Sequence, residues 1–315
     1  MIHPRLLAAA AVVTAAAAIG GATAAVTAIT AAAAPAPPPV QTPPVAAATP
    51  ADPVGADWVA IPDDELLMMT LAGNRSVAIR LAPRQAPAHV ANVRALAKAR
   101  WWDGLSVYRV QENWVTQWGD QSEAKPMPAG VAARPAAEYD AAAAFAPAQR
   151  LARGDAYAAA SGITADGWPI ATDGRGTVWM PHCYGTVGVA RDTSPDTGTG
   201  AELFMPIGGS ARRLDRNYTI VGRVIEGAQW LSGLPRSDAP LGMYASAAER
   251  LPILSVRLAS DMPAAERPHF QYRAADNARF AAMIAARANP KPPMVGLGGV
   301  DVCDVPLAVR HAPAG

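Results

Sequence analysis

The feature that most constrains the fold is a series of short apolar segments separated by turn residues. Each segment has the length and composition of a β-strand, and few helices are predicted between them. The segments are 65–72, 76–82, 106–110, 114–118, 186–190, 203–207, 219–224 and 253–258. Many short strands with few helices are typical of an all-β barrel.

Two predicted helices interrupt the strands. Apolar residues recur at helical spacing at Val90, Val93, Leu96 and Ala97. They predict an amphipathic helix over 87–100, with Pro87 in its first turn. A shorter helix is predicted over 227–231. Between the first two strand segments, Gly73-Asn74 is a turn signal that predicts a hairpin.

Two further segments differ from the barrel strands. Residues 136–160 are rich in alanine, which favours helices, so we predict a helical insertion at about 121–183 within a domain spanning 63–260. Residues 261–315 are predicted to form a C-terminal helix and a tail. The helix is expected over 273–289, where Phe280, Met283 and Ile284 share one face.

The N-terminal part has the composition of an export signal followed by a tether. From Leu6 to Ala34 the chain carries no charge, which predicts a signal peptide over 1–34, with an uncleaved membrane anchor as the alternative. Residues 35–62 are rich in Pro and Ala and predict an extended linker, with a ligand for a proline-recognition domain as the alternative. Lys is sparse while Ala, Pro and Arg are abundant, a composition that resembles the proteins of GC-rich bacteria. Together with the export signal, this composition predicts a periplasmic protein.

The charge balance excludes two classes of partner. The 27 basic and 26 acidic residues give a formal net charge of +1, which provides no electrostatic footprint for nucleic acid. It also provides no basic patch for an anionic membrane surface, so no membrane contact is expected beyond the signal segment. The sequence contains no HExxH, no phosphate-binding loop and no GxSxG, and we expect no cofactor.

The two cysteines, Cys183 and Cys303, are too few for a four-thiolate zinc site. Lone cysteines in an oxidising compartment most often pair, so we predict a disulfide between them. A metal site at His182 and Cys183 is the alternative, but three or four ligands at metal-binding spacing are absent from the sequence.

Several of the predicted strands carry motifs that resemble one family. The segment 107–120, VYRVQENWVTQWGD, is similar to the cyclophilin signature, in which an aromatic residue or His precedes an Arg and Gln-Gly-Gly-Asp closes the motif. Four further stretches resemble cyclophilin segments in the family's order: APAHVANVRAL at 86–96, GTVGVAR at 185–191, ELFMPI at 202–207 and LDRNYTIVGRVIEG at 214–227.

This resemblance implies an eight-stranded antiparallel barrel capped by two helices, and peptidyl-prolyl cis/trans isomerase activity on proline-containing chains. It places Arg109 as the catalytic residue, whose guanidinium hydrogen-bonds the prolyl nitrogen as the amide twists. The residues expected to bind the substrate are Tyr108, Trp114, Val115, Gln117, Ala190, Arg191, Glu202, Phe204, Leu214 and Tyr218. We expect the protein to act as a monomer.

The sequence also departs from the family pattern. Glu202 stands where the family has Gln, and a carboxylate there could pair with Arg109. Trp118 replaces the first glycine of the Gly-Gly pair, Arg191 replaces an Asn, and Arg213 occupies a position where eukaryotic members have Trp. Two hypotheses therefore stay open: an isomerase that assists the folding of exported proteins, and a catalytically weak peptide-binding or chaperone module.

Overall fold

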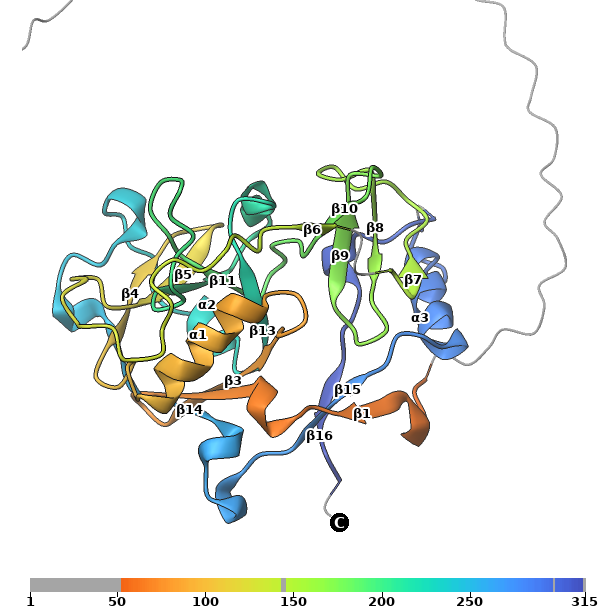
Figure 1. Cartoon of the computed structure of the whole chain (residues 1–315). Helices are drawn as coiled ribbons and strands as arrows, with labels where there is room; N and C mark the ends of the chain where they lie inside the picture. The colour runs from red at the N-terminus through yellow and green to blue at the C-terminus, as the bar shows by residue number, and fades with distance from the viewer. Residues whose placement is uncertain (1–51, 143–145, 297, 314–315) are drawn as a thin grey trace, which may run out of the picture. The chain divides into compact units, whose positions relative to one another are not determined.

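The largest sheet among the described residues is a closed eight-stranded antiparallel barrel (Figure 1). The computed structural model describes residues 52–142, 146–296 and 298–313. The barrel order is β11-β12-β5-β4-β14-β2-β3-β13. The bounds are β2 (Leu66–Leu71), β3 (Arg75–Leu81), β4 (Ser106–Val110), β5 (Val115–Gly119), β11 (Thr186–Val189), β12 (Leu203–Pro206), β13 (Ile220–Glu226) and β14 (Leu251–Leu258). The predicted barrel is confirmed, and each strand lies within two residues of its predicted limits.

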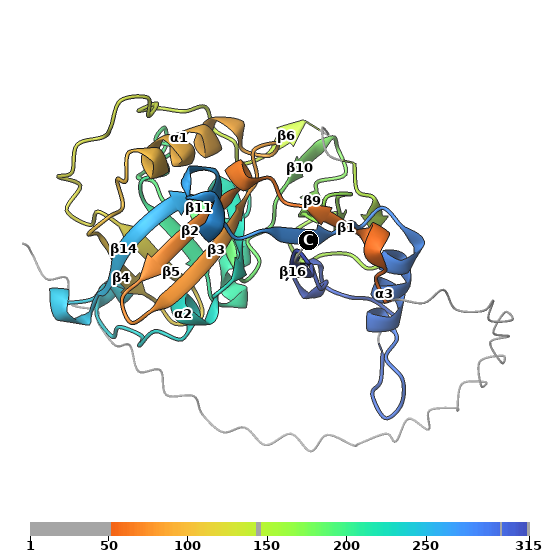
Figure 2. The ribbon, with the colours of Figure 1, turned by 90° about the horizontal axis from the view of Figure 1, so that it is seen from below.

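The hairpin β2–β3 shows why these segments form strands. Gly73 and Asn74 both adopt positive φ, of 79° and 54°, which closes the turn between the paired residues Leu71 and Arg75. Side chains alternate between two buried faces. One face points into the barrel core, and the other packs against the C-terminal part of the chain. Figure 2 shows β14, β2 and β3 side by side.

Helices α1 (Pro87–Lys98) and α2 (Gln229–Ser232) pack on the barrel, as predicted. The N-cap of α1 is Ala86, which has no side-chain acceptor for the first backbone N–H groups. Glu138 fills this role from a distant part of the chain. Its carboxylate accepts hydrogen bonds from the backbone N–H groups of Ala88 at 2.8 Å and His89 at 3.0 Å, and lies 2.6 Å from His89 Nδ1.

The predicted helical insertion at about 121–183 is wrong. The described residues of this span contain no helix and form a five-stranded sheet in the order β6-β10-β9-β8-β7. Pro147 and Gly154 interrupt the alanine-rich segment and oppose a helix there. Tertiary packing then decides the outcome, since Ile163 and Trp168 are buried. The bounds are β6 (Ala141–Ala142), β7 (Gln149–Arg150), β8 (Ala160–Ile163), β9 (Pro169–Thr172) and β10 (Thr177–Trp179).

A three-stranded sheet, β1-β15-β16, joins residues from both ends of the described chain. Strand β1 (Trp58–Ala60) lies in the segment predicted as linker, and β16 (Val309–His311) lies in the predicted tail. Both pair with β15 (Phe270–Arg273). The C-terminal helix is present as α3 (Ala278–Ala288), which buries Phe280 completely. The predicted signal peptide and the first part of the linker lie outside the described residues.

The insertion and the C-terminal extension share a second hydrophobic core. It contains Leu151 and Ile163 from the insertion, and Phe280 and Val302 from the extension. The predicted disulfide between Cys183 and Cys303 is confirmed, with the two Cα atoms 5.1 Å apart, and it belongs to this core. Within the part of the chain that the structure describes, no helix is both long and apolar enough to cross a membrane.

Candidate active site

Arg109 lies on β4 and is held by three acceptors. A register shift between Val107 and Arg109 places a bulge in the pairing of β4 with β5. Arg109 Nε donates to the carbonyl oxygen of Leu241 at 2.6 Å. Its two terminal nitrogens donate to Gln117 Oε1 at 3.0 Å and Gln111 Oε1 at 2.6 Å. Burial lowers the pKa of Arg109 below its ordinary value, but arginine stays protonated at any physiological pH.

The predicted pairing of Glu202 with Arg109 does not occur among the described side chains. Glu202 instead accepts a hydrogen bond from the Tyr108 hydroxyl at 2.5 Å and another from the backbone N–H of Asp120. Burial raises the pKa of Glu202 to about 7. Burial and the neighbouring Glu202 carboxylate also raise the pKa of Tyr108, so the phenol stays protonated.

A cavity of about 450 Å³ opens beside Arg109. Six of the predicted site residues line it: Tyr108, Arg109, Gln117, Ala190, Arg191 and Glu202. Its apolar walls include side chains that the sequence did not point to, among them Trp101, Met127, Leu241 and Met243. The cavity has room for more than one peptide residue beside the guanidinium.

The other five predicted residues, which are mostly apolar, do not line this cavity. Phe204 is only 4% exposed, and its ring stacks on His182 with the ring centres 5.8 Å apart. The rings of Phe204 and Tyr218 form a T-shaped pair with their centres 5.7 Å apart. Val115, at the start of β5, is buried and pairs with Pro206, while Trp114 just before it is half-buried. Leu214 is half-buried at the end of the 3-10 helix Gly209–Leu214.

The insertion reaches the rim of the site through Tyr139. The Arg191 guanidinium lies over the Tyr139 ring at 5.4 Å and over the Tyr218 ring at 4.8 Å. Arg191 Nε also donates to the carbonyl oxygen of Asn217 at 3.0 Å. Arg191 therefore joins three parts of the chain, and its guanidinium is only partly available to a ligand.

Comparison with known proteins assigns this barrel to a family. The sequence profile of the cyclophilin type peptidyl-prolyl cis-trans isomerase/CLD family matches residues 66–257, which is more than half of the 315 residues. The chain belongs to the cyclophilin family. Its members are peptidyl-prolyl cis/trans isomerases that act on proline-containing chains, and this chain is an enzyme of that class.

A solved cyclophilin structure shares the fold. The cyclophilin AquaCyp293 from Hirschia baltica is similar at 23% sequence identity and a TM-score of 0.62, over 81% of this chain and 93% of that one. This likeness extends beyond the 66–257 match. A cyclophilin of Cryptosporidium parvum, solved with the dipeptide Ala-Pro, has 14% identity and a TM-score of 0.38, over 61% of this chain and 98% of that one. No curated protein matches the sequence.

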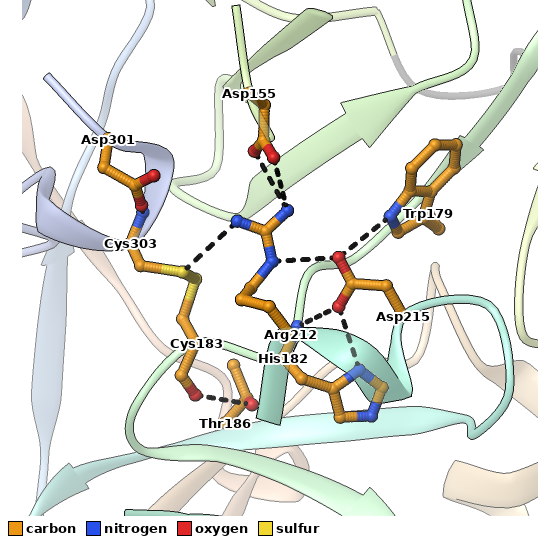
Figure 3. Close-up of a disulfide and its surroundings, with 9 residues drawn as sticks. All are labelled: Asp155, Trp179, His182, Cys183, Thr186, Arg212, Asp215, Asp301 and Cys303. Carbon is orange, nitrogen blue, oxygen red and sulfur yellow. Dashed lines mark hydrogen bonds and ion pairs between the residues drawn. A yellow bond between two sulfur atoms is a disulfide. The ribbon is translucent and has the colours of Figure 1, made fainter. Parts of the chain in front are cut away.

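A polar network lies beside the disulfide of this cyclophilin (Figure 3). Asp215 accepts from the backbone N–H of His182 at 2.8 Å and from Arg212 Nε at 2.9 Å. Arg212 also forms a two-oxygen contact with Asp155 of the insertion, at 2.9 Å to each oxygen. Burial lowers the pKa of His182, so the imidazole that stacks on Phe204 is neutral. The network thereby links Phe204 to the disulfide region.

Besides the apolar cavity-wall residues named above, sequence reasoning missed Gln111, Tyr139 and His182, and it missed the acceptor role of the Leu241 carbonyl. Gln111 could have been predicted from the sequence, because it follows Arg109 by two positions and residues two apart on a strand face the same side. Leu241 is 132 positions from Arg109, and nothing local marks its carbonyl as an acceptor. Within residues 52–142, 146–296 and 298–313, no group of three or more His, Cys, Asp or Glu side chains is arranged to hold a metal ion.

Proposed function

We propose that this cyclophilin isomerises X–Pro bonds by means of the Arg109 guanidinium. Rotation about the bond is opposed by amide resonance, with a barrier of roughly 20 kcal/mol. As the amide twists, the prolyl nitrogen becomes pyramidal and can accept a hydrogen bond. A donor placed there stabilises the twisted state more than either planar form, which is the requirement for catalysis.

The hydrogen bonding of Arg109 carries this proposal. A guanidinium has five N–H donors, of which three are assigned to Leu241, Gln117 and Gln111. Two donors are left without a partner among the described residues, on a group that three acceptors hold in place. Because the geometry is fixed before the substrate binds, little reorganisation is needed in the transition state.

The other predicted residues take supporting roles in this proposal. The polar wall of the cavity contacts the peptide backbone through Tyr108, Gln117, Ala190, Arg191 and Glu202. The proline ring contacts the apolar side, which comprises Trp114, Val115, Phe204, Leu214 and Tyr218. Because Phe204 is nearly covered, its ring must shift to receive a proline.

We further propose that the enzyme assists the folding of exported proteins in the periplasm, as a monomer released from a signal peptide over 1–34. The Cys183–Cys303 disulfide supports an oxidising compartment. Uncatalysed prolyl isomerisation takes about 10–100 s at 25 °C, so it limits the folding of many chains. A catalyst in that compartment shortens this step.

The covered Phe204 also favours the second candidate, a peptide-binding module with weak catalysis. One experiment separates the two. Exchange NMR on a capped Ala-Ala-Pro-Ala peptide is recorded with the full chain, with Arg109→Ala and with Arg84→Ala, whose side chain is 72% exposed. The isomerase predicts accelerated cis/trans exchange that Arg109→Ala abolishes and Arg84→Ala preserves. Peptide shifts on binding without accelerated exchange would support the binding module instead.

A further inference from the structure

Four side chains form a continuous hydrogen-bonded chain from Glu202 to Arg109. The Tyr108 hydroxyl donates to Glu202 Oε2, and the Gln117 side-chain amide donates to the same hydroxyl, each at 2.5 Å. Arg109 in turn donates to Gln117 Oε1 at 3.0 Å. All four side chains are at least half-covered by the surrounding protein or line the cavity wall.

The direction of every hydrogen bond in this chain is fixed at the Arg109 end. A guanidinium can only donate, so Gln117 must turn its oxygen toward Arg109. The Gln117 NH₂ group then faces Tyr108, whose oxygen must accept. The single hydroxyl proton of Tyr108 is therefore available only for Glu202.

The opposite end imposes the same direction. The second oxygen of Glu202, Oε1, accepts from the backbone N–H of Asp120, which can only donate. Both Glu202 oxygens therefore accept a hydrogen bond from a donor, which suits an ionised carboxylate. Gly119, with φ of +141°, makes room for this carboxylate, because a Cβ there would lie 2.2 Å from Oε1.

Resting on the proposed function of Arg109, we propose that Glu202 is a pH-dependent positioning residue for it. Ionised Glu202 holds Tyr108 and Gln117 in the orientation that presents an acceptor to Arg109. When Glu202 is protonated, its O–H competes for the Tyr108 oxygen. The Tyr108 proton must then turn toward Gln117, whose amide either loses this contact or rotates and faces Arg109 with NH₂. Rotation removes the Gln117 acceptor from Arg109, and loss of the Tyr108 contact removes the hydrogen bond that holds Gln117 in the orientation presenting this acceptor.

The groups around Glu202 place its protonation near neutral pH. Burial raises the pKa of Glu202, and the carboxylates of Asp120 and Glu123 raise it further. The hydrogen bonds from Tyr108 and from the Asp120 backbone lower it, but their effect is smaller. The charged or titratable groups that line the cavity around Glu202 are Tyr108, Arg109, Asp120, Glu123, Lys125, Arg191, Asp192 and Asp196.

The test follows two readouts between pH 5.5 and 8.5, with the capped Ala-Ala-Pro-Ala peptide, which has no titratable group. The first is catalysed exchange, and the second is the side-chain amide resonance of Gln117 in the free protein. In the wild-type protein we expect both to change with one midpoint near pH 7. Catalysed exchange should fall about tenfold on the acidic side, as expected for loss of one charged hydrogen bond.

Three variants separate an effect carried by the hydrogen-bonded chain from an effect of the Glu202 charge alone. Glu202→Gln should make both readouts independent of pH, with catalysed exchange as slow as in the wild-type protein at acidic pH. Glu266→Gln, an exposed control with the same charge change, should keep the wild-type pH dependence. Tyr108→Phe breaks the chain and leaves Glu202 to titrate, so both readouts should become independent of pH. A wild-type midpoint that persists in Tyr108→Phe would overturn the proposal, because Glu202 would then act through its field.

The second readout keeps this inference separate from the proposed function. If the wild-type protein catalyses no exchange at any pH, the isomerase mechanism fails. The Gln117 resonance still tests the hydrogen-bonded chain in that case. A Gln117 resonance that does not titrate in the wild-type protein would overturn the role of Glu202, whatever the catalytic result.

Discussion

At the residue scale, the site is built from side chains whose partners come from distant parts of the sequence. The family motif identified Arg109 and Gln117, which lie on neighbouring strands. It did not identify the Leu241 carbonyl, because backbone acceptors have no sequence signature. It misjudged Glu202, because charge alone suggested a pair with Arg109. The nearer donors, Tyr108 and the Asp120 N–H, bind the carboxylate instead.

Gly188 determines where the Phe204 ring can lie. A Cβ built at Gly188 would approach the tip of that ring to 2.3 Å. We expect Gly188→Ala to displace Phe204 from its stack on His182, to lower the free energy of unfolding by about 1–3 kcal/mol and to change KM for a proline peptide. Urea unfolding and steady-state kinetics measure both effects.

Gly209→Ala is the matched control for this prediction, because a Cβ at Gly209 meets nothing within 4 Å. It should leave stability and KM close to wild type. Equal effects of the two substitutions, or none from Gly188→Ala, would show that the Phe204 position does not depend on the space at Gly188.

At the scale of elements, the strands of the barrel were predictable and those of the insertion were not. Barrel strands such as β2 are short, almost continuous apolar runs bounded by turn signals, so local sequence and tertiary structure agree. The insertion is rich in alanine, whose helix propensity is outweighed by proline, glycine and the burial of Trp168 and Ile163. Strand β1 consists of only three residues and is specified mainly by its partner β15.

Helix α1 depends on an acceptor that lies outside it. Burial alone would raise the pKa of Glu138, but hydrogen bonds from His89 and from two backbone N–H groups hold it below its ordinary value near 4.5. The ionised form is therefore favoured by folding. We expect Glu138→Ala to lower the free energy of unfolding by about 1–2 kcal/mol at pH 7.

The sign of the pH dependence follows from the lowered pKa. The contribution of Glu138 is present above its unfolded-state pKa and is lost as the pH falls through its lower folded-state pKa. The stability difference between wild type and Glu138→Ala should therefore shrink below about pH 4.5. Glu138→Gln, which keeps an acceptor without the charge, should lie between the two at pH 7. A difference that grows on acidification would contradict this role of Glu138.

At the scale of the whole molecule, the insertion and the C-terminal extension form one unit beside the barrel. The disulfide was predicted only because two lone cysteines in an oxidising compartment usually pair. It could not predict that Phe280 and Ile163 share a core, because such contacts are 117 positions apart along the chain. The buried Arg212–Asp155 pair connects the same insertion to the barrel.

The disulfide should make a large contribution to the stability of this unit. It joins residues separated by 120 positions, and loop-closure entropy gives a loop of this length about 5 kcal/mol as an upper estimate. We expect the Cys183→Ser/Cys303→Ser double variant to unfold at a clearly lower urea concentration than the oxidised wild type. Wild type under reducing conditions should match the double variant. Identical midpoints for the oxidised and reduced wild type would contradict this prediction.

In the mechanism we propose, the Arg109 guanidinium, held by three acceptors, catalyses prolyl isomerisation. The most direct measurement is kcat/KM for cis/trans exchange of a capped proline peptide, compared between wild type and Arg109→Lys. Lysine keeps the charge but lacks the planar set of donors that Leu241, Gln117 and Gln111 hold in place. We expect a loss of about a hundredfold, comparable to removal of a preorganised transition-state donor. A lysine variant that retains near wild-type kcat/KM would contradict this mechanism, because charge alone would then suffice.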